Sequence, residues 1–302
     1  MTGPELVVLG GLTGLHAATW GAFKDTPFEG FRWRSFVRSV ALGLVMGTLL
    51  ATALPGSSAH APLVVIGLLY TGERLATEWW KTFVREDPQS AYTIPMRLAV
   101  NGRPVDAALP RYLTGLAVVV ALVLLATLVP QVGDGDAAWW VLVLVGGSGG
   151  WLTAVGGAWK DAPVEGFSRW KFLRSPAVAS VWAFLLLPLT RDPLTLAVAA
   201  GGLSVLVIET YKTFLTGGRP PGKFAGKPVR LVERAARDRC RALHCLLYGV
   251  LAAVTLGSPV AVLPVAAALA VAMLWTGRMW SVPVGTATQK ADVDASFRRE
   301  TR

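Results

Sequence analysis

The stretch GAFKDTPFEGFRWRSFVRS at residues 21–39 returns in altered form as GAWKDAPVEGFSRWKFLRS at residues 157–175. The two segments agree at 11 of 19 positions, and the charged letters of the shared KDxPxEGF motif are kept while apolar letters change. Both segments lie between long apolar runs. A polar motif that recurs in this setting predicts two copies of one membrane-embedded unit, joined in a single chain.

Two further pairs of similar segments follow in the same order. EWWKTF at 78–83 corresponds to ETYKTF at 209–214, and NGRPV at 101–105 corresponds to AGKPV at 225–229. Three matched blocks in one order, with small changes in spacing, predict duplication of a four-helix unit. Because four is an even number of crossings, both copies should have the same orientation in the membrane.

The composition predicts an all-α polytopic integral membrane protein. Of the 302 residues, 53% are hydrophobic and 16% are charged, whereas soluble domains carry about 25% charged residues. Nine runs are long and apolar enough to be membrane-spanning helices. The predicted spans are 5–23, 36–54, 62–80, 112–130, 138–158, 172–190, 194–211, 242–258 and 260–277.

These spans divide the chain into four parts. Residues 1–135 are expected to form the first four-helix repeat and residues 136–258 the second. Residues 259–280 would hold a ninth helix outside the repeat, and residues 281–302 a disordered cytosolic tail. Since no Lys or Arg precedes the first apolar run, that run is expected to be a retained helix rather than a cleaved signal peptide.

The basic residues predict the orientation. The net charge is +10, yet 27 of the 29 Lys and Arg residues fall in or beside the segments that follow the odd-numbered spans. The positive-inside rule therefore places those segments and the C-terminus in the cytosol and the N-terminus outside, in an inner membrane. The positive charge thus indicates topology and attraction to membrane lipids, and no nucleic acid partner is expected.

Small residues four apart occur in the first and fifth spans. Gly10 and Gly14 align with Gly146 and Gly150. This spacing lets two helix backbones approach closely in lipid, so each pair is expected to mark a tight internal helix contact.

The KDxPxEGF motif has a purely structural interpretation. Pro27 and Pro163 suit the first turn of a short helix, which Asp25 and Asp161 would cap. A glycine would then end that helix, and Arg38 and Arg174 would extend to the lipid headgroups. On this interpretation the motif is a shaped corner that both repeats need.

The functional interpretation is a binding site for an anionic ligand. The motif and the ExxKTF ends of the third and seventh spans lie on the same side, so each repeat could bring their charges together to hold a phosphate. Acidic members could orient the cations or bind a divalent cation such as Mg²⁺. The candidate ligand-binding residues are Lys24, Asp25, Glu29, Arg38, Glu78, Lys81, Lys160, Asp161, Glu165, Arg174, Glu209, Lys212, Arg219, Lys223 and Lys227.

The two halves are not equivalent. Only the first has the charged pair Glu73 and Arg74, which aligns with Ser204 and Val205 in the second. Only the second has the Gly-, Pro- and cation-rich segment 216–230, whose backbone N–H groups and cations suit anions. This asymmetry favours one working site over two.

The sequence does not choose an activity. It lacks the PSGH and SRxxxxxH blocks of phosphatidic acid phosphatases and the Asp-rich motifs of UbiA-type prenyltransferases, so no catalytic residue is transferred from either family. The leading hypothesis is a protein that binds a phosphorylated or lipid-like ligand at the cytosolic interface, as in a transferase of lipid or isoprenoid metabolism. A carrier with two pseudo-symmetric bundles and a non-catalytic membrane subunit are the alternatives.

Overall fold

The computed structural model describes residues 1–53, 61–89, 96–128, 136–215 and 234–256. Eight α-helices and one small hairpin lie in these ranges. Their bounds are α1 Gly3–Glu29, α2 Trp33–Ala53, α3 Pro62–Trp79, β1 Ala99–Val100, β2 Arg103–Pro104, α4 Ala108–Leu128, α5 Trp139–Glu165, α6 Arg169–Leu186, α7 Pro193–Thr210 and α8 Arg234–Leu256. π-Helical segments extend α3 (η2, Trp80–Val84) and α7 (η5, Tyr211–Leu215).

The chain is an all-α membrane protein in its described part, apart from the two-residue strands of the hairpin. A helix lies over each of the first eight predicted spans; the ninth, 260–277, and the tail lie outside the described residues. Five described helices are long and apolar enough to cross a membrane, namely α1, α2, α4, α5 and α7. α3 carries three charged residues within its 18 positions, Glu73, Arg74 and Glu78.

The glycines of the first and fifth spans lie at tight helix contacts. A Cβ added to Gly14 would be 2.4 Å from the carbonyl oxygen of Ser39 in α2. A Cβ added to Gly150 would be 2.4 Å from the carbonyl oxygen of Ser175 in α6. The two serines are themselves equivalent in the aligned halves, so the predicted close contact is confirmed in both, at corresponding positions.

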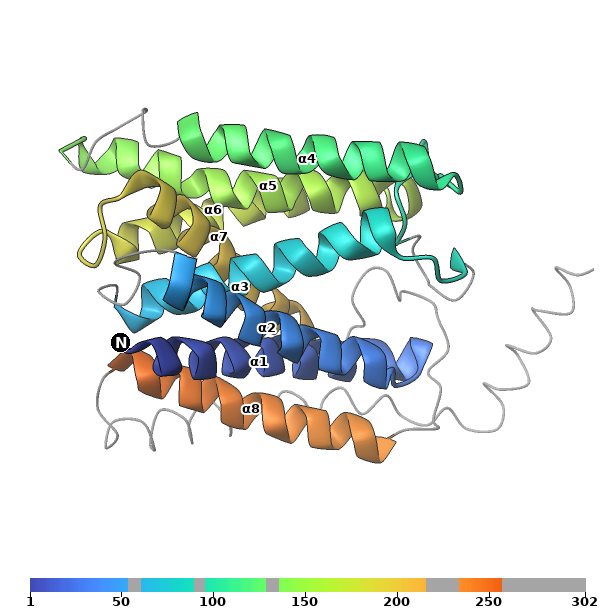
Figure 1. Ribbon diagram of the computed structural model, residues 1–302, viewed down its shortest axis with the longest axis horizontal. Helices are drawn as coiled ribbons and strands as arrows, with labels where there is room; N and C mark the ends of the chain where they lie inside the picture. Colours follow the sequence, from blue (N-terminus) through green and yellow to red (C-terminus); the bar gives the residue numbers. More distant parts are fainter. Residues whose placement is uncertain (54–60, 90–95, 129–135, 216–233, 257–302) are drawn as a thin grey trace, which may run out of the picture.

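α3 and α7 cross in the middle of the bundle and join the two halves (Figure 1). Their backbones approach closely because glycine leaves room: a Cβ on Gly202 would be 2.1 Å from the carbonyl oxygen of Gly67. The Thr71 hydroxyl donates to the carbonyl oxygen of Val198 at 2.7 Å across the same contact. Van der Waals contact and an interhelical hydrogen bond are the forces that hold membrane helices together.

The predicted short helix that begins at Pro27 and Pro163, within KDxPxEGF, is wrong. Pro27 and Pro163 lie inside the last turns of α1 and α5, which continue to Glu29 and Glu165. A proline there removes only one hydrogen bond near a helix end. Gly30 then ends α1 with φ 79°, and Gly166 ends α5 with φ 81°, a backbone region that only glycine adopts readily. The shared glycine is therefore a helix stop.

Substituting glycine with alanine should have opposite effects at two sites. Gly202→Ala places a methyl group against the α3 backbone and should destabilise the protein by about 1–3 kcal/mol. Gly156→Ala in α5 meets nothing within 4 Å and should stabilise it by up to about 1 kcal/mol, through higher helix propensity. Thermal unfolding in detergent measures both; equal midpoints for the two variants would contradict the close crossing.

Candidate ligand-binding site at one end of the bundle

Two ion pairs link the halves reciprocally. Lys24 Nζ lies 3.3 Å from Glu209 Oε2, and Lys160 Nζ lies 3.0 Å from Glu78 Oε2. The lysines are equivalent positions of the repeated motif, and the glutamates are equivalent positions of ExxKTF. Each half therefore donates a lysine to the glutamate of the other.

Each glutamate also binds the lysine three positions later on its own helix. Lys81 Nζ lies 2.8 Å from Glu78 Oε1, and Lys212 Nζ lies 2.9 Å from Glu209 Oε1. These i,i+3 pairs follow from the spacing of ExxKTF, which places Glu and Lys on one helix face. The motif lysines were expected to meet the glutamates of their own repeat, and for these two ion pairs that expectation is wrong, since both cross between the halves.

The pair found only in the first half is buried beneath these contacts. Glu73 is 1% exposed and accepts two hydrogen bonds from Arg74, at 2.5 and 2.8 Å, and one from Thr77 at 2.9 Å. The Arg74 guanidinium lies 5.3 Å from the ring of Trp20, whose Nε1 donates to the Tyr70 hydroxyl at 2.6 Å. A fully hydrogen-bonded ion pair is how a membrane interior accommodates charge.

Two arginines stack on the indole of Trp80. Arg38 Cζ lies 4.9 Å from the ring centroid and Arg85 Cζ 5.7 Å from it. Arg38 was expected to extend to the headgroups; instead, its guanidinium turns toward η2. Arg85 reaches the indole because η2 closes an i→i+5 hydrogen bond, from Arg85 N to Trp80 O at 2.9 Å.

The electrostatic neighbours of Arg38 are unbalanced. Arg74 and Arg85 lie within reach of its guanidinium, as do Glu73 and Glu78. Both carboxylates already bind other cations, and Arg38 Nε is buried with no hydrogen-bond partner in the part of the chain that the structure describes. Arg85 is paired with Asp87, at 3.6 Å between Nε and Oδ2, so the positive charge in excess around Trp80 is that of Arg38.

The other predicted site residues fall into three groups. Asp25 and Asp161 follow the paired lysines in the last turns of α1 and α5, and Glu29 and Glu165 are the final residues of those helices. Arg174 occupies in α6 the position that Arg38 has in α2, but Tyr211, which is 49% exposed, aligns with Trp80. The loop cations lie outside the described residues: Arg219, Lys223 and Lys227.

Burial affects the chemistry of one site lysine directly. Lys81 lies just beyond α3 and is 16% exposed. Burial lowers the pKa of Lys81 to about 8, although the nearby Glu78 carboxylate acts in the opposite direction. The ammonium group of Lys81 is therefore expected to lose its proton slightly above neutral pH.

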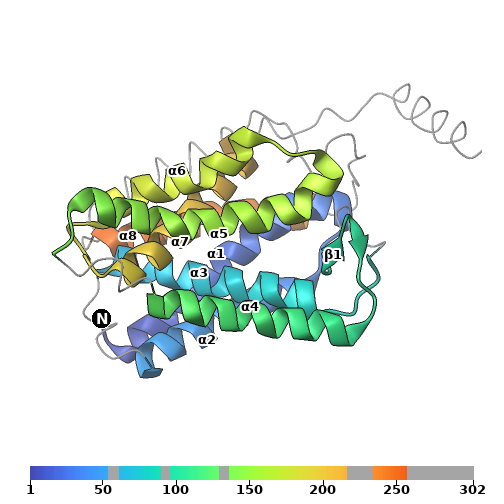
Figure 2. The same cartoon turned by 90° about the horizontal axis from the view of Figure 1, so that it is seen from above.

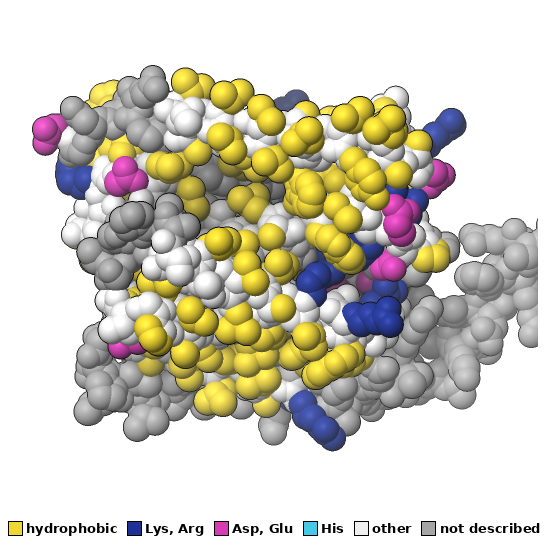
Figure 3. Space-filling view, in the orientation of Figure 1, with side chains coloured by type: hydrophobic (Ala, Val, Ile, Leu, Met, Phe, Trp, Pro, Cys, Tyr) yellow, Lys and Arg dark blue, Asp and Glu magenta, His cyan; other side chains and the backbone are white. Residues whose placement is uncertain are grey.

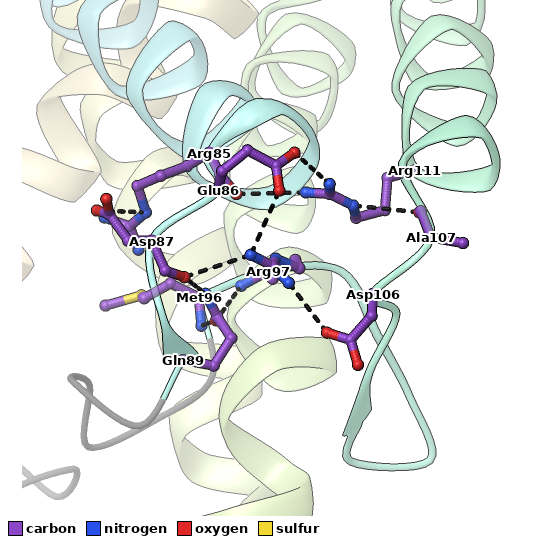
Figure 4. A network of polar contacts seen from close by, with 9 residues as sticks. All are labelled: Arg85, Glu86, Asp87, Gln89, Met96, Arg97, Asp106, Ala107 and Arg111. Atoms are coloured by element: carbon purple, nitrogen blue, oxygen red, sulfur yellow. Dashed lines mark hydrogen bonds and ion pairs between the residues drawn. The ribbon is translucent and has the colours of Figure 1, made fainter.

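A separate polar network fixes the segment between η2 and α4 (Figure 4). Arg97 binds Asp106 at 3.0 Å and the carbonyl oxygen of Asp87 at 3.3 Å, while Arg111 binds Glu86 and the carbonyl oxygen of Arg85. The hydrogen bond from Arg111 holds the pKa of Glu86 below its usual value. This network ties the backbone of Arg85 to α4 and so positions one wall of the Trp80 site.

The hairpin connects this segment to the other half (Figure 2). Asn101 and Gly102 both have positive φ, 50° and 77°, as an Asn-Gly two-residue turn requires. Trp159 of α5 donates to the carbonyl oxygen of Ala99 at 3.2 Å. The NGRPV hairpin therefore contacts the repeated motif of the second half.

The cations gather at one end of the molecule. In Figure 3 most of the Lys and Arg side chains on this face lie toward the right, beside the hydrophobic side chains that cover much of the middle of the face. Among the described residues, no group of three or more His, Cys, Asp and Glu side chains could hold a metal ion.

A buried pair of histidines also lies in the bundle, which spacing alone did not predict. His16 of α1 stacks on His244 of α8, with ring centroids 4.1 Å apart. Both are fully buried, and Tyr70 and Tyr248 surround them. Like the Trp80 contacts, this pairing depends on tertiary packing between residues 228 positions apart.

Comparison with known protein families, with curated proteins and with solved structures finds no match.

Replacing a glutamate of this cluster should lower the free energy of unfolding more than replacing the lysine that binds it from the other half. Glu209→Gln leaves Lys24 and Lys212 without their shared carboxylate, at a cost of about 3–5 kcal/mol. Lys24→Met leaves Glu209 still bound to Lys212, so its cost should be smaller.

Chemical or thermal unfolding of the two single variants and the double variant provides the test. The double-mutant cycle should show a coupling of about 0.5–3 kcal/mol. Strictly additive effects would mean that the Lys24–Glu209 contact between the halves is not formed.

Proposed function

We propose that this chain is a nine-span inner-membrane protein, built from two four-helix repeats of the same orientation and an extra helix, which binds an anionic ligand at its cytosolic face. The N-terminus is outside and the C-terminus is cytosolic in this proposal. Matching helix ends at Gly30 and Gly166, matching glycine contacts and reciprocal ion pairs support the duplication. The concentration of cations beside the last turns of α1 and α5 supports the orientation.

The observation that carries the proposed ligand is the excess of positive charge around Trp80. Arg38 and Arg85 share one indole; Arg85 is paired with Asp87, and the nearby Glu73 and Glu78 are bound to other cations. The positive charge in excess is therefore that of Arg38. Partly buried positive charge is unfavourable unless it is partnered. A phosphate group offers several acceptor oxygens and two negative charges, and guanidinium groups bind it with directed hydrogen bonds.

The proposed ligand site is single and belongs to the first half. In the second half Val205 takes the position of Arg74, and the residue aligned with Arg85 is Thr216. The excess of arginine is therefore not repeated. The two lysine–glutamate pairs that cross between the halves are assigned to holding them together, and the arginines, with Lys81 beside them, to the ligand.

Within this proposal, a transferase acting on lipid or isoprenoid substrates is favoured, with the cations clamping a phosphate. The residue that would act as a base or metal ligand is not assigned. A carrier is the second candidate, and the reciprocal ion pairs favour it, because pairs that cross between two halves at one end can close that end of a pathway.

Substituting Arg38 should weaken ligand binding, whereas its counterpart in the second half should tolerate the same change. We expect Arg38→Gln to reduce the affinity for dihexanoyl phosphatidic acid by at least about tenfold, since a charge-assisted hydrogen bond contributes about 1.5–3 kcal/mol. Arg174→Gln should change it by less than about twofold. Isothermal titration of detergent-purified, correctly folded protein measures both, and equal losses in the two variants would argue against a single site.

Binding should also weaken with rising pH through about 8, as Lys81 loses its proton. The charged form binds the anion, so affinity is highest below pH 8 and falls above it. Lys81→Arg keeps the positive charge over this pH range, so it should remove the part of the pH dependence that comes from Lys81. Titration of the ligand's own phosphate acts on both proteins alike, so the difference between their pH profiles isolates Lys81; superimposable profiles would exclude it from the site.

A further inference from the structure

Arg38 lies on the outward face of α2. Ala41, Val45 and Leu49 follow it at helical spacing, so the four residues share one face. All three apolar residues are exposed, with Val45 at 50% and Leu49 at 47%. The anion site therefore continues directly into an exposed apolar strip on the flank of the bundle.

The opposite face of α2 is closed. Gly43 and Gly47 lie against α1, where added Cβ atoms would be 2.2 and 2.5 Å from backbone oxygens. Met46 closes the side toward α3, lying against Gly72. The open side of α2 is therefore the one that carries Ala41, Val45 and Leu49, in line with Arg38, whose own side chain is partly exposed.

The apolar strip is about as long as the hydrocarbon region of one bilayer leaflet is thick. From Arg38 to Leu49 the helix rises about 16 Å, at about 1.5 Å per residue. Half of the roughly 30 Å hydrocarbon core is about 15 Å. A chain that begins at the level of Arg38 can thus lie beside Ala41, Val45 and Leu49 within a single leaflet.

Aromatic side chains mark the same boundary. Trp33 and Phe36 stack with centroids 5.9 Å apart at the start of α2, and Phe31 lies 5.9 Å from Phe36. Trp33 is 66% exposed. Exposed aromatic rings of this kind prefer the headgroup level of a bilayer, which sets Arg38, about one turn further along α2, near the level of lipid phosphates.

We propose that the ligand is a membrane lipid with a terminal phosphate, whose phosphate binds Arg38 and Arg85 beside Trp80 and whose chain lies along Ala41, Val45 and Leu49. This inference rests on the proposed function and names its substrate class. The lipid reaches the site sideways from the cytosolic leaflet. A free phosphate compound would use the arginines alone and gain nothing from the apolar strip.

The test compares two probes with the same headgroup. Dihexanoyl phosphatidic acid and glycerol 3-phosphate are titrated separately into the full-length protein in detergent, and their dissociation constants are compared. Val45→Ser alters the strip, and Val181→Ser is its matched control, because Val181 is the equivalent residue of α6 and is 59% exposed. Val45→Thr serves as a second, nearly isosteric variant of the strip.

We expect the lipid to bind at least about tenfold more tightly than glycerol 3-phosphate, and Arg38→Gln to weaken binding of both probes. Val45→Ser and Val45→Thr should weaken only the lipid, by about two- to fivefold, with Val181→Ser unchanged. Equal binding of both probes that depends on Arg38 would overturn the lipid assignment and leave the proposed anion site intact. Binding of neither probe, or binding insensitive to Arg38→Gln, would overturn the proposed function together with this inference.

Discussion

The crossing of α3 and α7 is the constraint on which the rest of the arrangement depends. Gly67 and Gly202 let the two backbones meet, so the C-terminal ends of both helices are fixed relative to each other. Glu78 and Glu209 stand at those ends, and each accepts a lysine from the opposite half. A looser crossing would separate four partly buried charges from their partners, which explains why small residues and charged residues are found on the same two helices.

The proposed duplication of the scaffold and the proposed single site are compatible. Elements that hold the bundle together recur in both halves: the glycine contacts, the helix stops and the lysine–glutamate pairs. Arg74, Arg85 and Trp80 have no counterparts of the same type in the second half. Charges that only join the halves must recur to preserve the pseudo-symmetry, whereas a ligand needs its binding groups once. Arg38 does recur, as Arg174, so its surroundings rather than the arginine alone set the first half apart.

The helical membrane class, the positions of the described helices and the glycine contacts could be predicted from the sequence, because apolar length and small-residue spacing are local signals. Pro27 was assigned to a separate short helix, but it lies in the last turn of α1. The residues around it in the sequence are compatible with both positions. The Trp80 site was missed for another reason. Its two arginines come from different elements, and one of them reaches the indole only through a π-helical turn that no residue pattern announces. The crossed ion pairs likewise follow from tertiary packing.

The polar groups inside α1 extend the same asymmetry toward the bilayer centre. His16, Trp20 and Lys24 are four residues apart and face α8, α3 and α7, where they contact His244, Tyr70 and Glu209. The corresponding residues of α5 are Leu152, Gly156 and Lys160, so only the outermost position is shared. Burying imidazole, indole and phenol groups costs free energy that leucine and glycine would avoid. His16 and Trp20 of α1 have no polar counterparts on α5, so the two halves differ from the membrane interface toward the bilayer centre. This difference supports placing the proposed ligand site in the first half.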